Sequence, residues 1–374
     1  TGTFAAQSAR KENPDVKIDI YSHDERLPYY RLRLADILLD PSQAEKLYLH
    51  PASWYNEQNI ELHLGKTATH VDPDAKELHF EDGSCISYDR LILATGSRPF
   101  VPPFEGSDLP GVHTLWTMDD ALTIEEEIKE GEPAVVIGGG LLGLEMAYNL
   151  AQRGMDVSII EHNDRLLSRQ LDEAASDIFE KQVKQKGIHV VKNGDTTELL
   201  PGEDGRVEKV HLQDGREVPA SLVIISTGVR ANVQTLPEDE VKINRRVVVN
   251  DKMETSAPDI YAAGDVATVD DLWFGLWTIS MKQGQVAGTN AAGGDASYTS
   301  TVPPYRVNTM DTHINSAGII TEPEEHEGEY REEVEKDEDK LIYKKVCYLD
   351  EQICGYVLVG DISEANQLQK QMNQ

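Results

Sequence analysis

The chain has 374 residues, of which 39% are hydrophobic and 27% are charged, so it has room for two or three soluble domains. Its formal net charge of −31 disfavours nucleic acids and anionic membrane surfaces as partners, because phosphate contacts require a basic surface. No apolar run is long enough to span a bilayer, and three cysteines do not make a disulfide framework, so we expect a cytoplasmic protein.

The first residues look like the middle of a nucleotide-binding unit that recurs further along the chain. Residues 1–6 (TGTFAA) match residues 142–147 (LGLEMA), where the glycine ends a G-x-G-x-x-G motif. Gly2 would then be the last glycine of a second such motif. We therefore expect the first strand and the first two glycines of this unit to precede residue 1.

Acidic and basic side chains follow the strand that the pattern predicts over residues 16–21. Asp24 or Glu25 could be the acid that binds a ribose, and the spacing leaves both open. Arg31 and Arg33 then lie among apolar and aromatic residues, where an arginine can contact a phosphate. An acidic turn without a ligand, and surface arginines paired with acids, are the alternatives.

A strand–turn–strand pattern ending in (A/S)TG occurs twice. Short strands are predicted over residues 60–80, and the hairpin signal Asp82-Gly83 precedes Ala94-Thr95-Gly96. Asp214 stands in the same relation to Ser226-Thr227-Gly228, with 13 residues from the aspartate to the threonine in both cases. We interpret this as a duplicated nucleotide-binding domain, which predicts two bound nucleotides.

Residues 134–161 contain every element of a βαβ unit. The apolar residues 134–137 predict a buried strand, which a helix and a second strand follow. Between strand and helix, three glycines have the spacing G-x-G-x-x-G, and an acid ends the second strand: Gly138, Gly140, Gly143 and Glu161. This arrangement predicts a pyrophosphate at the helix N-terminus and ribose hydroxyls at the acid. A glycine-rich turn without a ligand is the alternative.

Other elements of this region follow from periodicity and turn signals. Helices are predicted over 117–129, 166–186 and 281–291, and a strand over 188–191. Gly264-Asp265 ends a short strand, and we place it at the start of the last of these helices. Asp265 could there accept hydrogen bonds from a sugar-alcohol chain, or it could simply cap the helix.

The composition changes at about residue 303. Residues 322–339 are rich in glutamate and predict a solvated loop or hairpin tip, and alternating strands over 341–347 and 353–358 flank the turn at Asp350-Glu351. A short helix is predicted over 363–374. By register we expect Cys347 and Cys354 to face one another across the turn, and we interpret them as two core cysteines and not as a redox pair.

These motifs carry a family likeness. The two dinucleotide units, the two (A/S)TG turns and residues 261–265 (YAAGD) resemble the two-dinucleotide-binding flavoprotein superfamily. Residues 27–34 (LPYYRLRL) look like the branch that contains NADH:rubredoxin oxidoreductases and the flavin portion of assimilatory nitrite reductases. The resemblance implies an α/β fold of two Rossmann-like, doubly wound, three-layer ββα domains. They would comprise an FAD domain (1–112 and 236–302) and an NAD domain (113–235), followed by an α+β interface domain (303–374).

The resemblance also implies a set of cofactor-binding residues. NADH would lie on the central glycines and Glu161, and Glu145 matches the acid near the nicotinamide amide, unless it is only an acid in the first turn of a helix. The remaining predicted cofactor-binding residues, most of them at the FAD, are Gly2, Asp24, Arg31, Ala94, Thr95, Gly96, Gly228, Gly264 and Asp265. No zinc, P-loop or hydrolase pattern is found, so no metal site is predicted.

We therefore predict an FAD-dependent NADH:acceptor oxidoreductase. Hydride would pass from C4 of NADH to N5 of the flavin, and electrons would then pass to a small redox protein such as a rubredoxin or another iron protein. Neither a C-x-x-x-x-C motif nor a cysteine near Pro28-Tyr29 is present, so no thiol is expected to react. An NADH oxidase or peroxidase and an NADH-gated interaction module are the alternatives, and a homodimer is left open. Rubredoxins are commonly acidic, so a chain with a net charge of −31 would repel such a partner.

Overall fold

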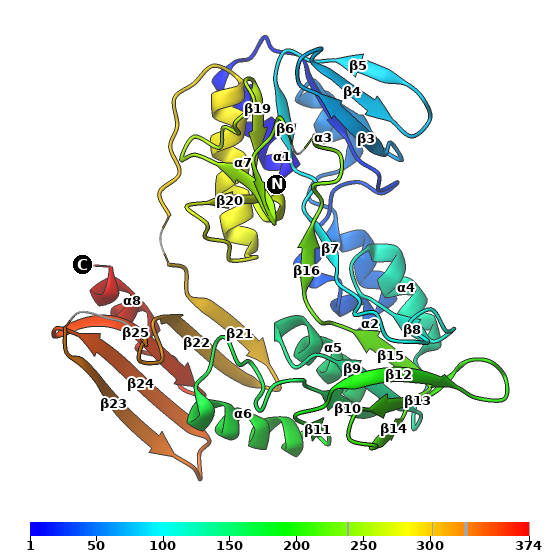
Figure 1. The fold of residues 1–374 in the computed structure, drawn as a ribbon, viewed down its shortest axis with the longest axis vertical. Coiled ribbons are helices and arrows are strands. Elements are labelled where there is room, and N and C mark those ends of the chain that lie inside the picture. The colour runs from blue at the N-terminus through cyan, green and yellow to red at the C-terminus, as the bar shows by residue number, and fades with distance from the viewer. Residues whose placement is uncertain (238, 301, 325–327, 374) are drawn as a thin grey trace. The chain divides into compact units, whose positions relative to one another are not determined.

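The computed structural model describes residues 1–237, 239–300, 302–324 and 328–373 (Figure 1). The chain divides into two compact units. Unit one comprises residues 1–32, 45–98 and 229–301, and unit two comprises residues 33–44, 99–228 and 302–374. None of the described helices is long and apolar enough to cross a membrane.

Unit one contains short sheets and two long helices packed on one another. Its elements are α1 (Gly2–Glu12), β1 (Ile18–Tyr21), α3 (Ala52–Glu57), β2 (Ile60–His63), β3 (Ala68–Asp72), β4 (Glu77–Phe80), β5 (Cys85–Ser87), β6 (Leu91–Leu93), β7 (Ser97–Pro99), β16 (Val229–Ala231), β17 (Ile243–Asn244), β18 (Arg246–Val249), β19 (Ile260–Ala262), β20 (Ala267–Val269) and α7 (Trp277–Ala291). Its sheets include the parallel pairs β1–β2 and β6–β19 and the antiparallel sheet β3–β4–β5.

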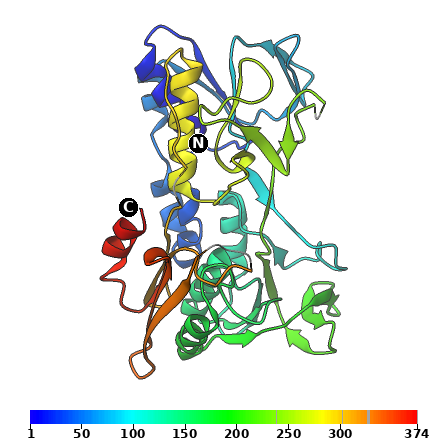
Figure 2. The same ribbon diagram turned by 60° about the vertical axis from the view of Figure 1, so that its left-hand side comes forward.

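The helices α1 and α7 run side by side, as Figure 2 shows in blue and yellow. Glycines on α7 allow this contact. A Cβ at Gly288 would lie 2.0 Å from the carbonyl oxygen of Ala5, and one at Gly284 would lie 2.7 Å from that of Thr1. The backbones can approach only where α7 has no side chain.

Unit two is built on a parallel five-stranded sheet with the order β11-β10-β9-β15-β8. Its elements are α2 (Asp36–Leu39), β8 (Val112–His113), α4 (Met118–Glu127), β9 (Pro133–Ile137), α5 (Leu141–Gln152), β10 (Asp156–Ile160), α6 (Glu173–Gln185), β11 (His189–Val191), β12 (Thr196–Pro201), β13 (Val207–Leu212), β14 (Glu217–Pro219) and β15 (Leu222–Ile225).

The residues of β9 alternate between two cores. Ala134 and Val136 pack among the helices, whereas Val135 and Ile137 pack against the sheet β12–β13–β14. A strand buried on both faces explains the continuous apolar run in the sequence. The result is a helix layer, a parallel sheet and a second sheet, which confirms the predicted three-layer ββα class.

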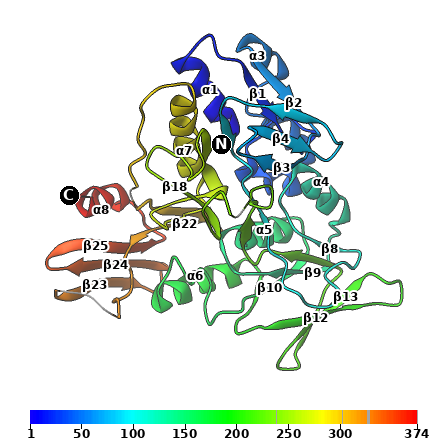
Figure 3. The same cartoon turned by 45° about the horizontal axis from the view of Figure 1, so that its top comes forward.

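The C-terminal part of unit two is an antiparallel sheet with the order β21-β22-β25-β24-β23, followed by α8 (Figure 3). Its elements are β21 (Tyr305–Thr309), β22 (Thr312–Gly318), β23 (Tyr330–Asp337), β24 (Ile342–Leu349), β25 (Gln352–Val359) and α8 (Ala365–Met372). Tyr343 and Val357 of this sheet share a core with Ile178 and Phe179 of α6. The sheet is therefore anchored to the nucleotide-binding part of the same unit.

Two predicted elements were wrong in extent. The helix expected over 166–186 begins only at Glu173, because the Asp172 side chain caps it by accepting a hydrogen bond from the Ala175 N–H. The described part of the glutamate-rich segment 322–339 includes a strand, β23, instead of only a loop or hairpin tip. Its glutamates are held by lysines of β24: Glu332 by Lys345 at 2.7 Å and Glu335 by Lys344 at 3.3 Å. Residues 325–327 of that segment lie outside the described residues.

Two placements also differ from prediction. Asp265 lies in a short 3₁₀ helix, Gly264–Val266, and β20 separates it along the chain from α7, which begins at Trp277. On β24 and β25, Cys347 pairs with Gly355, and a bulge at Cys347/Tyr348 displaces Cys354 from the position opposite it. The two cysteines therefore do not face one another in register.

Candidate dinucleotide sites

Three glycines in the turn after β9 have three different surroundings. Gly138 has φ +116°, and a Cβ there would lie 2.3 Å from the carbonyl oxygen of Ser226. A Cβ at Gly143 would lie 2.0 Å from the carbonyl oxygen of Gly138. At Gly140, which precedes the first residue of α5, no described heavy atom beyond its two chain neighbours lies within 4 Å of such a Cβ. The turn thus needs glycine twice for packing and leaves open space at the helix N-terminus, which fits a pyrophosphate.

Glu161 is held against this glycine turn. It is 7% exposed, and one carboxylate oxygen accepts a hydrogen bond from the Gly139 N–H at 2.7 Å. The other oxygen accepts from the backbone and side-chain nitrogens of Asn163 at 2.7 and 2.6 Å. The predicted ribose acid therefore lies beside the predicted phosphate turn.

Gly139 was missed by sequence reasoning. A Cβ there would lie 2.5 Å from Leu166 Cδ2 and 2.9 Å from Glu161 Oε2. The signal was present as three consecutive glycines, but the G-x-G-x-x-G spacing treats the middle position as free. Gly139 is needed so that its N–H can reach the acid.

Arg165, four residues after Glu161, is the nearby basic side chain that could bind the extra phosphate of NADPH, and it is engaged by its own loop. Its Nη1 lies 2.9 Å from the Asp164 carboxylate, and its other nitrogens reach the carbonyl oxygens of Leu171 and Ser168 at 3.4 and 3.5 Å. The arginine is thus tied to residues 164–171.

Gly228 follows β15 at the same edge of the parallel sheet as Gly138. It has φ +103°, and among the described residues no heavy atom beyond its two chain neighbours lies within 4 Å of a Cβ placed there. Its carbonyl oxygen accepts from the Phe100 N–H at 2.9 Å, and the Thr227 hydroxyl donates to the Phe100 carbonyl at 2.6 Å. The carboxyl ends of β9, β10 and β15 therefore bring Gly138, Glu161 and Gly228 to one edge.

Glu145 is on α5, one turn beyond the helix start. The helix begins at Leu141 and has no acid in its first turn, so the alternative of a first-turn, dipole-stabilised acid is wrong. Burial, followed by the nearby carboxylate of Asp36, raises the pKa of Glu145 to about 7. A carboxyl group that exchanges its proton near neutral pH is typical of a functional position.

Unit one brings a second set of predicted residues together. The strands β6 and β19 are parallel neighbours, so Ala94-Thr95-Gly96 and Gly264-Asp265 lie at one edge. The Ser97 hydroxyl donates to the Asp265 carboxylate at 2.9 Å. A Cβ at Gly264 would lie 2.4 Å from Thr1 Oγ1, and a Cβ at Gly2 would be in ordinary contact with Ala94. The start of α1 thus lies at the same edge.

Two residues around this edge were not predicted. Gln283, a buried side chain of α7, accepts a hydrogen bond from the Gly264 N–H at 2.9 Å and so fixes the turn that carries Asp265. Asn232 and Thr95 exchange side-chain-to-backbone hydrogen bonds of 2.8 and 2.9 Å. Neither Gln283 nor Asn232 belongs to a sequence motif. Each makes its contact with a residue that is distant in the sequence, so no local pattern could reveal it.

Asp24 and Arg31 lie beyond the end of β1. The Tyr29 hydroxyl donates to Asp24 at 3.0 Å, and the Arg31 guanidinium lies 5.5 Å from the centre of the Tyr29 ring. By register, however, Ser22 is the counterpart of Glu161. Each follows its strand by one residue, and each donates its N–H to the neighbouring strand's last residue. Asp24 lies two residues further along, and its role as a ribose ligand stays a prediction.

All three cysteines lie in the described part of the chain and are free. Cys347 is buried, and burial raises the pKa of its thiol to about 11, which keeps the thiol unreactive. Cys354 is half-buried, with a pKa also raised by burial.

Parallel strands that end in glycine turns, once in each unit, give the protein the architecture of a dinucleotide-binding fold. Residues 1–284 match the profile of the pyridine nucleotide-disulphide oxidoreductases, and residues 303–374 match the rubredoxin NAD+ reductase C-terminal domain. The chain belongs to the pyridine nucleotide-disulphide oxidoreductase family.

Three relatives indicate the range of the family. The assimilatory nitrate reductase electron transfer subunit of Bacillus subtilis is 31% identical over 94% of this chain, which spans only 45% of that protein. The NADH-rubredoxin oxidoreductase of Clostridium acetobutylicum is 33% identical over 99% of this chain and 91% of its own length. Its crystal structure superposes with a TM-score of 0.84, covering 99% and 92% of the two chains at 31% identity. An NADH oxidase of Methanocaldococcus jannaschii is 32% identical over 85% of this chain and 74% of its own.

Proposed function

We propose that the chain is an FAD-dependent NADH:acceptor oxidoreductase whose electrons leave to a small redox protein. The observation that carries this proposal is the duplication: each unit has its own parallel strand pair that ends in an (A/S)TG turn, together with a helix that has a glycine in its first turn, Gly2 in α1 and Gly143 in α5. One unit suffices for one dinucleotide, so two such edges require two. Similarity to an NADH-rubredoxin oxidoreductase over nearly its whole length supports the same assignment.

Unit two is assigned to NADH. The open space at Gly140 and the N-terminus of α5 would receive the pyrophosphate, Glu161 would accept the ribose hydroxyls, and Gly228 would border the site. Glu145 would contact the nicotinamide amide. Because burial raises its pKa to about 7, Glu145 can be protonated near neutral pH and can then donate a hydrogen bond.

Unit one is assigned to FAD. Gly2 at the start of α1, the turn Ala94-Thr95-Gly96 and Asp265 would hold the cofactor, and Asp265 would accept hydrogen bonds from its hydroxyl chain. Asp24 and Arg31 are assigned to its ADP portion. When bound, FAD and NADH supply the hydride and electron chemistry, and the chain supplies position and electrostatics.

The acceptor is proposed from the C-terminal part of the chain. Residues 303–374 form a sheet anchored to α6 and match a domain named for rubredoxin reductases. Similarity to an NADH oxidase favours oxygen as a second candidate acceptor. The third candidate is an interaction module in which bound NADH controls docking of a partner through residues 303–374. The cytoplasm and a homodimer are the proposed location and assembly.

An acceptor screen with the FAD-loaded protein tests the proposal. Rapid NADH oxidation only in the presence of an iron–sulfur or rubredoxin-type protein supports electron transfer to a small protein. Equal rates with air alone would instead establish an oxidase. Slow turnover with every acceptor, together with an NADH-dependent change in assembly, would overturn the enzyme assignment. Light scattering during the same titration reports the oligomeric state.

A further inference from the structure

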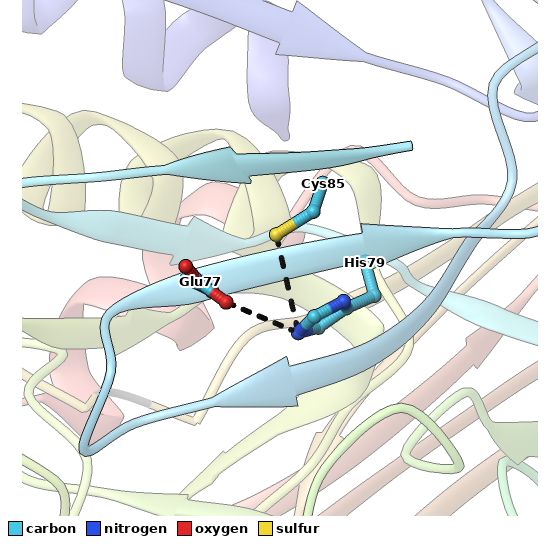
Figure 4. Close-up of side chains that lie close together, drawn as sticks. All are labelled: Glu77, His79 and Cys85. Carbon is cyan, nitrogen blue, oxygen red and sulfur yellow. Dashed lines mark hydrogen bonds and ion pairs between the residues drawn. The ribbon is translucent and has the colours of Figure 1, made fainter. Parts of the chain in front are cut away.

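Three potential metal ligands lie together on one face of the sheet β3–β4–β5 in unit one. Glu77 and His79 are two residues apart on β4, and Cys85 is the residue directly opposite His79 on β5. Their neighbours Leu78, Phe80 and Ile86 turn the other way and pack into the core. Figure 4 shows the carboxylate and the thiol converging on the imidazole.

The distances in this cluster suit a small cation. His79 Nε2 lies 3.6 Å from a Glu77 carboxylate oxygen and 4.0 Å from Cys85 Sγ, and one ligand atom from each residue lies within 4.8 Å of the others. Tetrahedral zinc with bonds of about 2.0–2.3 Å separates its ligand atoms by about 3.3–3.7 Å. Side-chain shifts of up to about 1 Å would therefore bring the three ligand atoms to three corners of a tetrahedron.

The carboxylate of Glu77 has no lysine or arginine partner. Among the described residues, neither kind of side chain lies within ion-pair distance of Glu77. The residue directly opposite Glu77 on β3 is another acid, Asp72. A second group of similar composition, Asp19, Glu61 and His63, differs in this respect. There the Lys17 ammonium lies 3.1 Å from Asp19 and 3.8 Å from Glu61, so a cation is already supplied by the chain.

The β4–β5 turn fixes the register that brings the ligands together. The Phe80 N–H donates to the Ser84 carbonyl at 2.9 Å, and the Ser84 N–H donates to the Asp82 side chain at 3.0 Å. Lys66 forms a further ion pair with Asp82. The ligands thus stand on a paired hairpin and not on a loose loop, which lowers the cost of ordering them.

We propose that Glu77, His79 and Cys85 form a zinc site, with water as the fourth ligand. A thiolate and an imidazole select a borderline transition metal over magnesium or calcium, which prefer oxygen ligands. On binding, Cys85 gives up its thiol proton to solvent, neutral His79 coordinates through Nε2, and Glu77 contributes a carboxylate oxygen. No electron is transferred in this step.

The sequence showed no zinc motif because Glu77-x-His79 and Cys85 come together only through strand register.

The first test measures zinc on the chelator-treated, full-length, FAD-loaded protein by equilibrium dialysis. We expect one zinc per chain. Cys85→Ser and His79→Ala should each weaken binding by at least ~10-fold, because loss of a ligand exceeds the usual cost of losing an outer-shell contact. Glu61→Gln, in the lysine-neutralised group, is the matched control and should leave zinc binding unchanged.

The second test locates the metal. Zinc should slow alkylation of Cys85 by iodoacetamide, followed by peptide mass spectrometry, while Cys354 reacts at an unchanged rate. Unaltered zinc affinity in Cys85→Ser, equal protection of Cys354, or the absence of binding up to about 10 µM free zinc would each overturn the proposal. These readouts do not depend on catalysis, so they are independent of the acceptor question.

Discussion

The carboxylate of Glu161 accepts a hydrogen bond from the backbone N–H of Gly139 at 2.7 Å, so the acid at the end of β10 is fixed beside the turn that follows β9. The proposed ribose acceptor and the proposed phosphate turn are therefore held to one another by the chain's own hydrogen bond. Such preorganisation reduces the ordering cost of binding.

The glycine turn predicts opposite outcomes for two similar substitutions. Gly140→Ala places its methyl group in open space, so the free energy of unfolding should change by no more than about 1 kcal/mol. NADH binding should weaken at least about ten-fold, since that space is assigned to the pyrophosphate. Gly143→Ala places its methyl group 2.0 Å from a backbone oxygen and should cost about 3 kcal/mol or more. Urea titration and NADH titration of both variants check this, and normal NADH affinity in Gly140→Ala would contradict the assignment.

We predict that the carboxylate of Asp172 anchors the C-terminal sheet to α6. Its carboxylate accepts from Ala175 at the start of α6, from the Tyr343 hydroxyl at 2.7 Å, and pairs with Lys345, whose side chain is 6% exposed, at 3.1 Å. Asp172→Ala leaves a buried ammonium with one carboxylate fewer and should destabilise the protein by about 3–5 kcal/mol.

Asp172→Asn separates the two roles of this side chain. The amide oxygen still caps α6, so the loss should be smaller, about 1–3 kcal/mol. The exposed Asp177→Ala on the same helix is the control and should change the free energy of unfolding by less than about 0.5 kcal/mol. Equal losses for Asp172→Ala and Asp177→Ala in urea would show that the buried ion pair contributes nothing.

The sequence predicts what is local and misses what depends on register. Gly138, Gly140 and Glu161 belong to one contiguous motif, whose strand–helix–strand context is confirmed, whereas their assignment to a cofactor stays a prediction. Gly139 acquires its importance only when β10 brings Glu161 beside it. The composition of β23 indicates a loop, and its pairing becomes visible only with the lysines of β24 across the sheet.

We predict that retention of the flavin depends on the carboxylate of Asp265. Its carboxylate accepts from Ser97 and lies at the edge that Gly2 and Ala94-Thr95-Gly96 share. If it also accepts from the flavin's hydroxyl chain, Asp265→Ala should weaken FAD binding by about 1–3 kcal/mol, or about ten- to a hundred-fold. Released flavin measured by fluorescence after gel filtration gives the affinity. Asp295→Ala, an exposed aspartate of the same unit, is the control, and stoichiometric FAD in Asp265→Ala at micromolar protein would count against this site.

Glu145 predicts a pH dependence of stability. Its pKa in the folded protein is raised from 4.5 to about 7, so the folded state binds the proton more tightly than the unfolded chain. The stabilisation from this proton is fully present below about pH 4.5 and is lost as the pH rises through about 7.

The variant Glu145→Gln keeps a neutral side chain at every pH. Its free energy of unfolding should therefore exceed that of the parent by an amount that grows across this window to about 1–3 kcal/mol, allowing for solvent screening. Urea midpoints from pH 4.5 to 8 give the difference, with the exposed Glu126→Gln as control. A difference independent of pH would show that Glu145 is ionised throughout.

The last prediction is the choice of cofactor. Glu161 is buried beside the glycine turn, where the extra phosphate of NADPH would meet its carboxylate. Two like charges at about 4–5 Å repel by about 3–4 kcal/mol at an effective dielectric constant of about 20. Solvent and side-chain movement reduce this to about 1–3 kcal/mol, so NADH should be preferred at least about ten-fold in kcat/KM.

Three variants separate charge from shape in that preference. Glu161→Gln keeps an acceptor for Gly139 and removes the charge, so the preference should narrow, and Glu161→Arg should narrow or reverse it. Arg165→Ala should leave it unchanged, because that side chain is held by Asp164 and by the backbone oxygens of its own loop. Steady-state kinetics with both cofactors and one fixed acceptor give each ratio. Equal use of NADH and NADPH by the parent would mean that Glu161 does not face the ribose, and a shift in Arg165→Ala would mean that the arginine leaves its loop to bind the phosphate.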